Sequence, residues 1–476
     1  MAKFPWRDFL QKTAAIAIPV ALQNLLMTTG SMIDTMMIAS LGQLSVAAVG
    51  LCAQFSSLMF SGYWGFVGGG MLFFSQYYGA RDDEGIHRSF GLTLLCMLVV
   101  GLSFGLFGTL FPAQVMDLYT DKAAIAAIGE KYLRIVALSY PLNVIAMAAS
   151  SLLRSTGRVR IPLYAGITQV VVNCFLNYCL IGGHLGFPAL GVEGAAVATL
   201  ISSVVNVTVV YLLAWRSGHG YLTAFSRHFR FSGHGSFVRQ YFMKCFPIIC
   251  NELLIGIGNM VINVVLGRQS ENAIAAIAVF RTLEGLVIGF FAGFSNAASV
   301  LVGKEVGAGH PETAYQRAIR MVYLCMGCIG CVGLALVALH TPILTAMGLS
   351  GESLQIGYGL LLIYTVASVI RMGNWTHNDT FRSAGDATWG TVLEILFMYG
   401  MVLPLVTSIG LLLHAPFFLV FACCYMDEPV RFIFMQVHLW HGTWIRPVTE
   451  EGRAAMPAFR VDHPESARRW RREKEA

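Results

Sequence analysis

Apolar stretches about as long as a bilayer is thick recur along most of this chain, and they limit the folds open to it. A transmembrane α-helix needs about 20 predominantly apolar residues. Only 12% of the 476 residues are charged, against about 25% in a typical soluble domain. No strand-length stretch alternates polar and apolar residues as an outer-membrane barrel does. These features predict an all-α polytopic membrane protein.

Twelve membrane-spanning helices are expected. Several are longer than the roughly 20 residues that a bilayer needs, which predicts tilting or extension into water. The polar start of the chain leads directly into the first span without a small-residue cleavage site, so no removed signal peptide is expected. The predicted spans lie near residues 14–38, 45–76, 90–111, 123–149, 160–182, 191–214, 240–266, 272–303, 318–340, 352–380, 388–411 and 415–440.

The second half of the chain repeats the first. The turn LRSTGRVRIP contains Arg154, its echo FRSAGDATWG contains Arg382, and the two arginines are 228 positions apart. We expect each arginine to hold its turn at the level of the lipid headgroups. The same offset relates Pro19 to Pro247, Gly30 to Gly258, Met32 to Met260, Ala47-Ala48 to Ala275-Ala276, Gly79-Ala80 to Gly307-Ala308 and Gly105 to Gly333.

Because each repeat has an even number of spans, both repeats keep the same orientation in the membrane. This predicts two six-helix lobes related by a pseudo-two-fold axis along the membrane normal. The predicted organisation is an N-terminal lobe over 1–214, a linker over 215–239, a C-terminal lobe over 240–448 and a disordered basic tail over 449–476.

Positive charge gathers on one set of loops, in the linker and in the tail. The positive-inside rule therefore places both termini and the linker in the cytoplasm, with the spans in the plasma or inner membrane. The tail ends RRWRREKEA and is expected to contact anionic headgroups. Since the net charge of +6 is explained by these loops, no nucleic-acid partner is expected.

Residue types that hold metals and cofactors show no recognised spacing. The eleven cysteines lie singly in apolar segments apart from the pair Cys423-Cys424, and we expect them to be packing residues. No G-x-x-x-x-G-K-[ST] phosphate loop and no H-E-x-x-H motif occurs. The sequence predicts neither an enzyme nor a cofactor, and we expect a monomer whose partner is the lipid bilayer.

Several motifs resemble the multidrug and toxic compound extrusion family. They are GHLGFPALGVEGAAVATLIS at 183–202, the paired R-S-x-G turns, FPIICNELL in the seventh span and GKEVGAG at 303–309. The closing MDEPVRFIFMQVHLWHGTWIRPVT resembles the end of bacterial members, so the resemblance covers about residues 12–449. It implies a two-lobe antiporter that expels organic, often cationic, compounds in exchange for H⁺ or Na⁺. Two lobes in parallel orientation are also an architecture of alternating access.

Coupling to an ion gradient needs an ionisable group inside the membrane, and Asp34 is the first candidate. It lies in TTGSMIDTMMIA, 22 residues after Lys12, or about 33 Å along a helix. The position matches the aspartate on span one of the family. The alternative is an interfacial aspartate that faces outer water.

Asn173 and Asn177 are four residues apart and share one face of the fifth span. They match the polar pair that faces the span-one aspartate in the family. Many members have aspartate at the position of Asn177. One carboxylate fewer weakens a dedicated sodium site and keeps a proton site at Asp34 open. The alternative role is amide packing between helices.

Glu252 follows the helix-loosening Pro247 by five residues in the second lobe. The resemblance marks this glutamate as a cation-binding carboxylate. Its repeat partner is Asn24, so the two lobes are not chemically equal. The alternative is a glutamate that is hydrogen-bonded within its own lobe.

Further charges occur in the spans of the second lobe. Arg281 and Glu284, three residues apart, are expected to pair with each other. Arg371 lies about 16 Å along a helix from Arg382, where some relatives carry an acidic residue. It could neutralise Glu252 or Glu284, with Glu394 as another partner, or receive an anionic substrate group. The resulting supporting polar cavity comprises Asn24, Asn173, Asn177, Glu284 and Arg371.

Three other protein classes share parts of this pattern. A major facilitator transporter also has two parallel six-helix repeats, but GARDDEGIHR matches its loop motif only loosely. A lipid-linked sugar flippase is expected to need a strongly basic cavity, and arginines inside these spans are few. An integral membrane enzyme is the alternative of a different class.

Overall fold

A computed structural model of the protein describes residues 4–223, 235–268, 270–413 and 415–466. Within these ranges the chain forms helices and no strands, which confirms the all-α prediction. Eleven helical segments there are long and apolar enough to cross a membrane.

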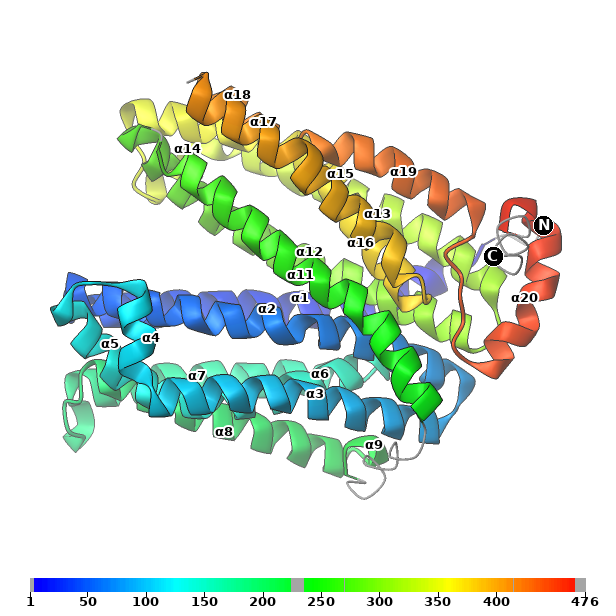
Figure 1. The fold of residues 1–476 in the computed structure, drawn as a ribbon, viewed down its shortest axis with the longest axis horizontal. Coiled ribbons are helices and arrows are strands. Elements are labelled where there is room, and N and C mark those ends of the chain that lie inside the picture. Colours follow the sequence, from blue (N-terminus) through cyan, green and yellow to red (C-terminus); the bar gives the residue numbers. More distant parts are fainter. Residues whose placement is uncertain (1–3, 224–234, 269, 414, 467–476) are drawn as a thin grey trace. The chain divides into compact units, whose positions relative to one another are not determined.

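The helices of the first repeat follow the predicted spans closely (Figure 1). The fourth predicted span is built from two helices joined by a single 3-10 turn. The helices are α1 (Trp6–Ala39), α2 (Gln43–Ala80), α3 (Asp83–Leu110), α4 (Pro112–Tyr119), α5 (Ala123–Val136), α6 (Tyr140–Ser155), α7 (Arg160–Gly182), α8 (Val192–Arg216) and the short α9 (Gly220–Thr223).

The second repeat differs from the prediction at its last two spans. The eleventh contains π-helical turns on both sides of α17, and the twelfth is broken between α18 and α19. The helices are α11 (Gly235–Leu266), α12 (Glu271–Gly307), α13 (Pro311–Ala338), α14 (His340–Ala346), α15 (Gly351–Ser383), α16 (Ala387–Phe397), α17 (Leu403–Thr407), α18 (Phe417–Cys423), α19 (Asp427–His441) and α20 (Glu450–Asp462).

Packing divides the chain into two compact units. Unit one contains Met1–Ala21, Ser75–Asp82 and Met243–Ala476. Unit two contains Leu22–Phe74 and Asp83–Phe242. The start of α1 and the last turns of α2 therefore pack with helices of the second repeat.

In unit two, α7 packs along α8, and α3 along α6 (Figure 1). The R-S-T-G turn joins α6 to α7, with Gly157 at a φ of 80° that favours glycine. Arg154 is buried and donates a 2.9 Å hydrogen bond to Gln23 on α1. An amide inside the unit therefore binds the guanidinium of Arg154, a contact that the sequence did not predict.

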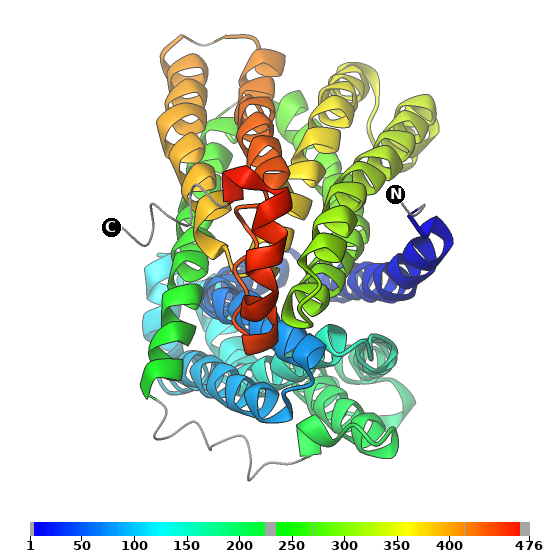
Figure 2. The same cartoon turned by 90° about the vertical axis from the view of Figure 1, so that its right-hand side faces the viewer.

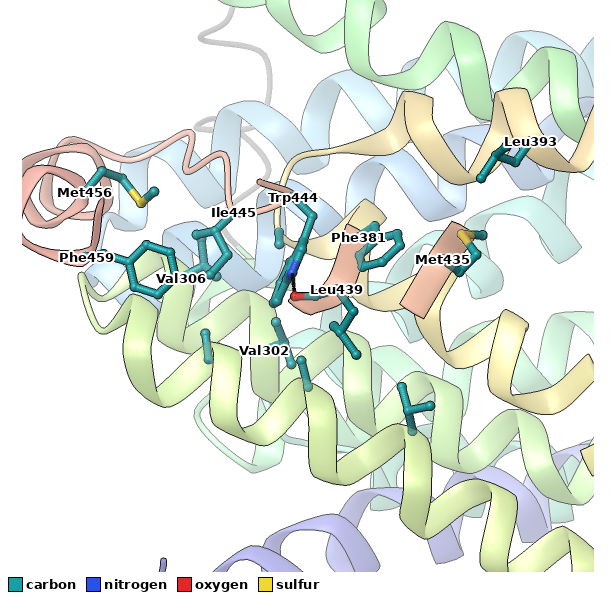
Figure 3. Packing of buried hydrophobic residues seen from close by; sticks show 14 residues of the cluster. Val302, Val306, Phe381, Leu393, Met435, Leu439, Trp444, Ile445, Met456 and Phe459 are labelled. Carbon is teal, nitrogen blue, oxygen red and sulfur yellow. Dashed lines mark hydrogen bonds between the residues drawn. The ribbon is translucent and has the colours of Figure 1, made fainter. Parts of the chain in front are cut away.

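In unit one, α12 and α13 pack against α15, and α15 packs against α19. A core cluster near the end of the chain joins these helices to the segment after α19 (Figure 3). There the indole nitrogen of Trp444 donates a 3.0 Å hydrogen bond to the backbone of Leu439. Phe381 on α15 and Met435 on α19 belong to the same cluster.

The segment 450–462 forms α20, where the sequence predicts a disordered tail (Figure 2). Thr449 caps this helix by accepting a hydrogen bond from the backbone of Gly452. Met456 and Phe459, three residues apart, are both buried, and α20 contacts α12 and α13. The apolar face is too short to stand out in a segment that is rich in charged residues. Residues 467–476 of the predicted tail, and 224–234 of the predicted linker, lie outside the described ranges.

Two glycines let the end of α2 cross the end of α12 inside unit one. A Cβ atom on Gly79 would collide with the backbone oxygen of Lys304, and one on Gly307 with the backbone oxygen of Gln76. Gln76 and Lys304 are 228 positions apart, as the two glycines are. The contact is therefore reciprocal, like the self-complementary contact of a two-fold dimer. We name it the glycine crossing.

We expect Gly79→Ala and Gly307→Ala each to destabilise the purified protein by about 1–3 kcal/mol, because the added methyl group forces two backbones apart. The thermal denaturation midpoint in detergent measures this loss. The control is Gly327→Ala on α13, where a Cβ atom has nothing within 4 Å. Midpoints of the crossing variants equal to that of the control would contradict the expectation.

His219 lies after α8 in the predicted linker and contacts the first R-S-x-G turn. One of its ring nitrogens lies 2.9 Å from the hydroxyl of Thr156. Burial, assisted by the positive charge of Arg158, lowers the pKa of His219 from 6.5 to about 4. Since the folded pKa lies below the unfolded one, the unfolded chain binds the extra proton. This contribution to stability is complete above about pH 6.5 and is lost toward about pH 4.

We therefore expect His219→Gln to weaken the fall in denaturation midpoint between about pH 7.5 and 5. The absolute midpoint of the variant is immaterial, since the slope with pH is the quantity measured. His184→Gln, which alters an exposed histidine, should keep the slope of the original protein. Equal slopes for all three proteins would show that His219 contributes nothing to the acid sensitivity.

Candidate functional site

The predicted group around Asp34 forms inside unit two. The side-chain nitrogen of Asn177 lies 2.6 Å from a carboxylate oxygen of Asp34 and 3.1 Å from the amide oxygen of Asn173. Asn177 is fully buried, whereas Asp34 is half-buried. The carboxylate on α1 is therefore held by neutral amides on α7.

Close packing of α1 and α7 places these side chains together. A Cβ atom on Gly30, one turn before Asp34, would lie 3.0 Å from Val170 on α7. The side-chain oxygen of Asn177 has no hydrogen-bond partner among the described residues. The group thus presents oxygen atoms from one carboxylate and two amides.

Asn24, also predicted for the polar cavity, is not part of this group. It lies ten residues before Asp34 on α1, a separation of about 15 Å along the helix. Its backbone oxygen accepts a 3.0 Å hydrogen bond from Thr28.

Glu252 is paired with the arginine of the second R-S-x-G turn. Arg382 approaches its carboxylate to 3.5 Å, and Pro247 lies one turn earlier inside α11. One turn before Arg382, Asp379 accepts a 2.5 Å hydrogen bond from Ser295. Like Arg154, Arg382 pairs with a side chain inside its own unit.

Arg371 neutralises Glu284, and no pairing with Glu252 is found among the described residues. Arg281 and Arg371 each approach the Glu284 carboxylate to 2.8 Å, from α12 and α15 respectively. The hydroxyl of Tyr425 donates a third, 3.2 Å hydrogen bond to the same glutamate. The predicted i,i+3 pair on α12 is therefore confirmed, and it belongs to a larger group.

The first turns of α19 supply three charged residues that sequence reasoning did not single out. Arg431 approaches Glu428 to 2.7 Å, Asp427 to 3.4 Å and Glu394 on α16 to 3.6 Å. Asn374 donates a 2.7 Å hydrogen bond to Glu428. The motif D-E-x-x-R could have indicated this group, because its i,i+3 and i,i+4 spacing places both acidic side chains beside the arginine on one helix.

These charges line a cavity of about 130 Å³ in unit one, which is room for about four water molecules. Apart from the amide of Asn259, apolar and aromatic side chains cover the rest of its wall. The lining includes Arg281, Arg371, Trp375, Glu394, Met398, Tyr425, Asp427, Glu428 and Arg431. Among the described residues no group of three or more His, Cys, Asp or Glu side chains is arranged to hold a metal ion.

A family model described as MatE matches the chain twice, over residues 19–179 and 247–407. Both the starts and the ends of the two matches are 228 residues apart, which reproduces the repeat offset. The "Probable multidrug resistance protein YoeA" of Bacillus subtilis is 26% identical over 403 residues, covering 84% of this chain and 86% of the relative. The "Probable multidrug resistance protein NorM" of Burkholderia pseudomallei is 26% identical and covers 69% of each chain.

Solved structures share the fold at low sequence identity. A mutant of the Vibrio cholerae MATE transporter VcmN has a TM-score of 0.80 at 16% identity, covering 91% of this chain and 96% of that one. A MATE protein in the bent conformation has a TM-score of 0.78 at 18% identity, with the same coverage. These likenesses support the fold of twelve spans in two lobes.

Proposed function

This chain belongs to the multidrug and toxic compound extrusion (MatE) family of efflux transporters, and we propose that it is a secondary antiporter. It exports small organic, cationic or amphipathic compounds in exchange for protons or sodium ions. The protein is a multi-pass membrane protein, and its family consists of transporters rather than enzymes. We further propose that both termini face the cytoplasm of a cell membrane and that the chain works as a monomer.

The observation that carries the coupling proposal is the 2.6 Å contact of Asp34 with Asn177 inside two predicted spans. An ionised carboxylate inside a membrane is costly unless an opposite charge lies beside it. The amides of Asn173 and Asn177 supply hydrogen bonds without a compensating positive charge. A bound proton or cation supplies that compensation, so its binding favours the arrangement in which the carboxylate is most enclosed.

A proton is the favoured coupling ion at Asp34. Asn173 and Asn177 bring neutral amides to Asp34, and neutral amides attract a sodium ion less strongly than a second carboxylate would. A protonated Asp34 needs no coordination shell, and hydrogen-bond acceptors of Asn173 and Asn177 are close to it. Substrate and proton then influence each other's binding through one conformational equilibrium.

Glu252 is the proposed coupling carboxylate of the second repeat. Together with Asp379 it contributes two carboxylates to a region where Arg382 contributes one guanidinium. Cation binding at Glu252 removes that excess of negative charge. The two coupling sites then lie in different repeats and respond to the same gradient.

The cavity of unit one argues against a lipid-linked sugar flippase. Its three arginines each pair with carboxylates, as shown by the contacts of Arg281 and Arg371 with Glu284 and of Arg431 with α19. Guanidinium groups that are already neutralised offer little attraction to a polyanionic headgroup.

We expect Asp34→Asn to reduce gradient-driven export by at least about tenfold, because the amide cannot gain or lose the coupling proton. Glu252→Gln should reduce export for the same reason. Export of a fluorescent organic cation is measured in proteoliposomes with a proton gradient and a sodium gradient imposed separately.

The matched control is Asp117→Asn, which makes the same chemical change at an exposed position on α4. It should transport like the original protein. Export by Asp34→Asn at the original rate under both gradients would contradict its coupling role. Wild-type protein that transports under neither gradient would contradict antiport itself.

A further inference from the structure

The charged side chains around the cavity of unit one do not balance. Four carboxylates share three guanidinium groups, and every guanidinium is within 4 Å of at least one carboxylate. We call this group the cavity cluster. It consists of Glu284, Glu394, Asp427 and Glu428 with Arg281, Arg371 and Arg431.

One uncompensated negative charge in a buried cluster carries a large desolvation cost. Glu284, Glu394, Asp427 and Glu428 are all nine-tenths or more buried. Removing one negative charge makes the cluster neutral. The structure therefore offers a binding place for a single positive charge.

The hydrogen-bond partners identify the least compensated carboxylate. Glu284 is held by two arginines and a tyrosine, and Glu428 by Arg431 and Asn374. Glu394 accepts hydrogen bonds of 3.1 and 3.0 Å from Asn251 and Asn378.

Asp427 has a weaker set of contacts. Its side chain meets Arg431 at 3.4 Å, and no hydrogen bond to its carboxylate is found among the described residues. The charges that act on it are Arg431 and Glu428 from α19, Arg371 from α15 and Glu394 from α16. Two of these are negative, so ionised Asp427 faces repulsion as well as attraction.

A second, independent feature belongs to the same cavity. Arg431 is 4% exposed and lines the cavity, and its Nε–H has no hydrogen-bond partner among the described residues. The cavity has room for about four waters. Water there can accept a hydrogen bond from this buried donor and carry a proton to the excess carboxylate.

We propose that the cavity cluster binds one proton, held on Asp427, at a third site beyond Asp34 and Glu252. A metal ion fits less well, because it would lie beside the guanidinium of Arg431. A proton occupies one carboxylate oxygen and needs no such space. The site's role in export rests on the proposed antiport, whereas proton binding itself does not.

The position of Asp427 links this proton to the shape of the twelfth span. Asp427 is the first residue of α19, directly after the break that follows α18. A negative charge at this end of a helix interacts favourably with the helix dipole. Protonation removes that interaction and one partner of Arg431, so it loosens the start of α19. A broken helix beside a cavity is also a common setting for ion sites in transporters.

The first test counts protons. Purified full-length protein and Asp427→Asn are titrated in unbuffered detergent solution between about pH 8.5 and 5.5, and the original protein should take up about one proton more per chain. Asp117→Asn at an exposed site is the control for the loss of an aspartate, and its uptake should match that of the original protein. Equal uptake by the original protein and Asp427→Asn overturns the proposal.

The second test uses Trp375, which lines the cavity beside Arg371. The fluorescence of the original protein minus that of Trp375→Phe isolates this residue, and it should change with pH in a single transition. Glu394→Gln also makes the cluster neutral, so it should abolish the transition. This variant replaces Asp427→Asn in the test if Asp427→Asn does not fold. A pH-independent Trp375 signal in the original protein overturns the proposal.

Replacing choline chloride by sodium chloride at about pH 8.5 separates the two ions. No change in Trp375 fluorescence is expected, and a sodium-dependent change that Asp427→Asn lacks overturns the proton assignment. Transport is measured in parallel. Proton uptake without gradient-driven export would contradict the proposed function but not the proton site. Export without the extra proton would contradict the proton site but not the proposed function.

Discussion

The cost of an ionised side chain in a medium that excludes water determines how the interior of this protein is arranged. Several charged residues that the sequence places inside spans meet a partner from another helix. Arg371 and Arg281 converge on Glu284, and Arg382 reaches Glu252. Such contacts require α12, α15 and α19 to lie at fixed rotations about their axes, because a turned helix would leave a charge unpaired. Positional specificity in unit one thus comes from charge, while apolar packing supplies the surrounding core.

The two repeats use the same framework for different chemistry. Arg154 and Arg382 are equivalent by the 228 offset and bind neighbouring positions on the first helix of their repeats. The partner is neutral Gln23 in one case and acidic Glu252 in the other. The turn keeps its geometry through Gly157 and Gly385, both with positive φ. The two turns therefore share their backbone geometry, but the arginine pairs with an acidic side chain in the second repeat alone.

Sequence patterns predicted what depends on local composition and on the repeat. Span positions and the Arg281–Glu284 pair follow from apolar length and helical spacing, whereas the meeting of Asp34 with Asn177 was implied by the family resemblance. The partners of the R-S-x-G arginines were not predicted, since each lies about 130 positions away along the chain. Four members of the cavity cluster, Arg281, Glu284, Arg371 and Glu394, were named from the sequence. The three charged residues on α19 were missed because their partners on α15 and α16 are distant along the chain. Helix α20 escaped notice because two buried side chains, Met456 and Phe459, create little periodicity.

The glycine crossing has a consequence for how a duplicated gene can change. Near a pseudo-two-fold axis the two repeats contact each other through equivalent residues. A substitution in one repeat must therefore be compatible with the contacting surface of the other repeat. Gly79 meets the backbone at Lys304, and Gly307 meets the backbone at Gln76. Drift at these two glycines is restrained in both copies at once, whereas Asn24 and Glu252 were free to diverge. Identity at this pair of glycines thus reflects a contact between the two copies, whereas Gly30 and Gly258 pack within their own repeats.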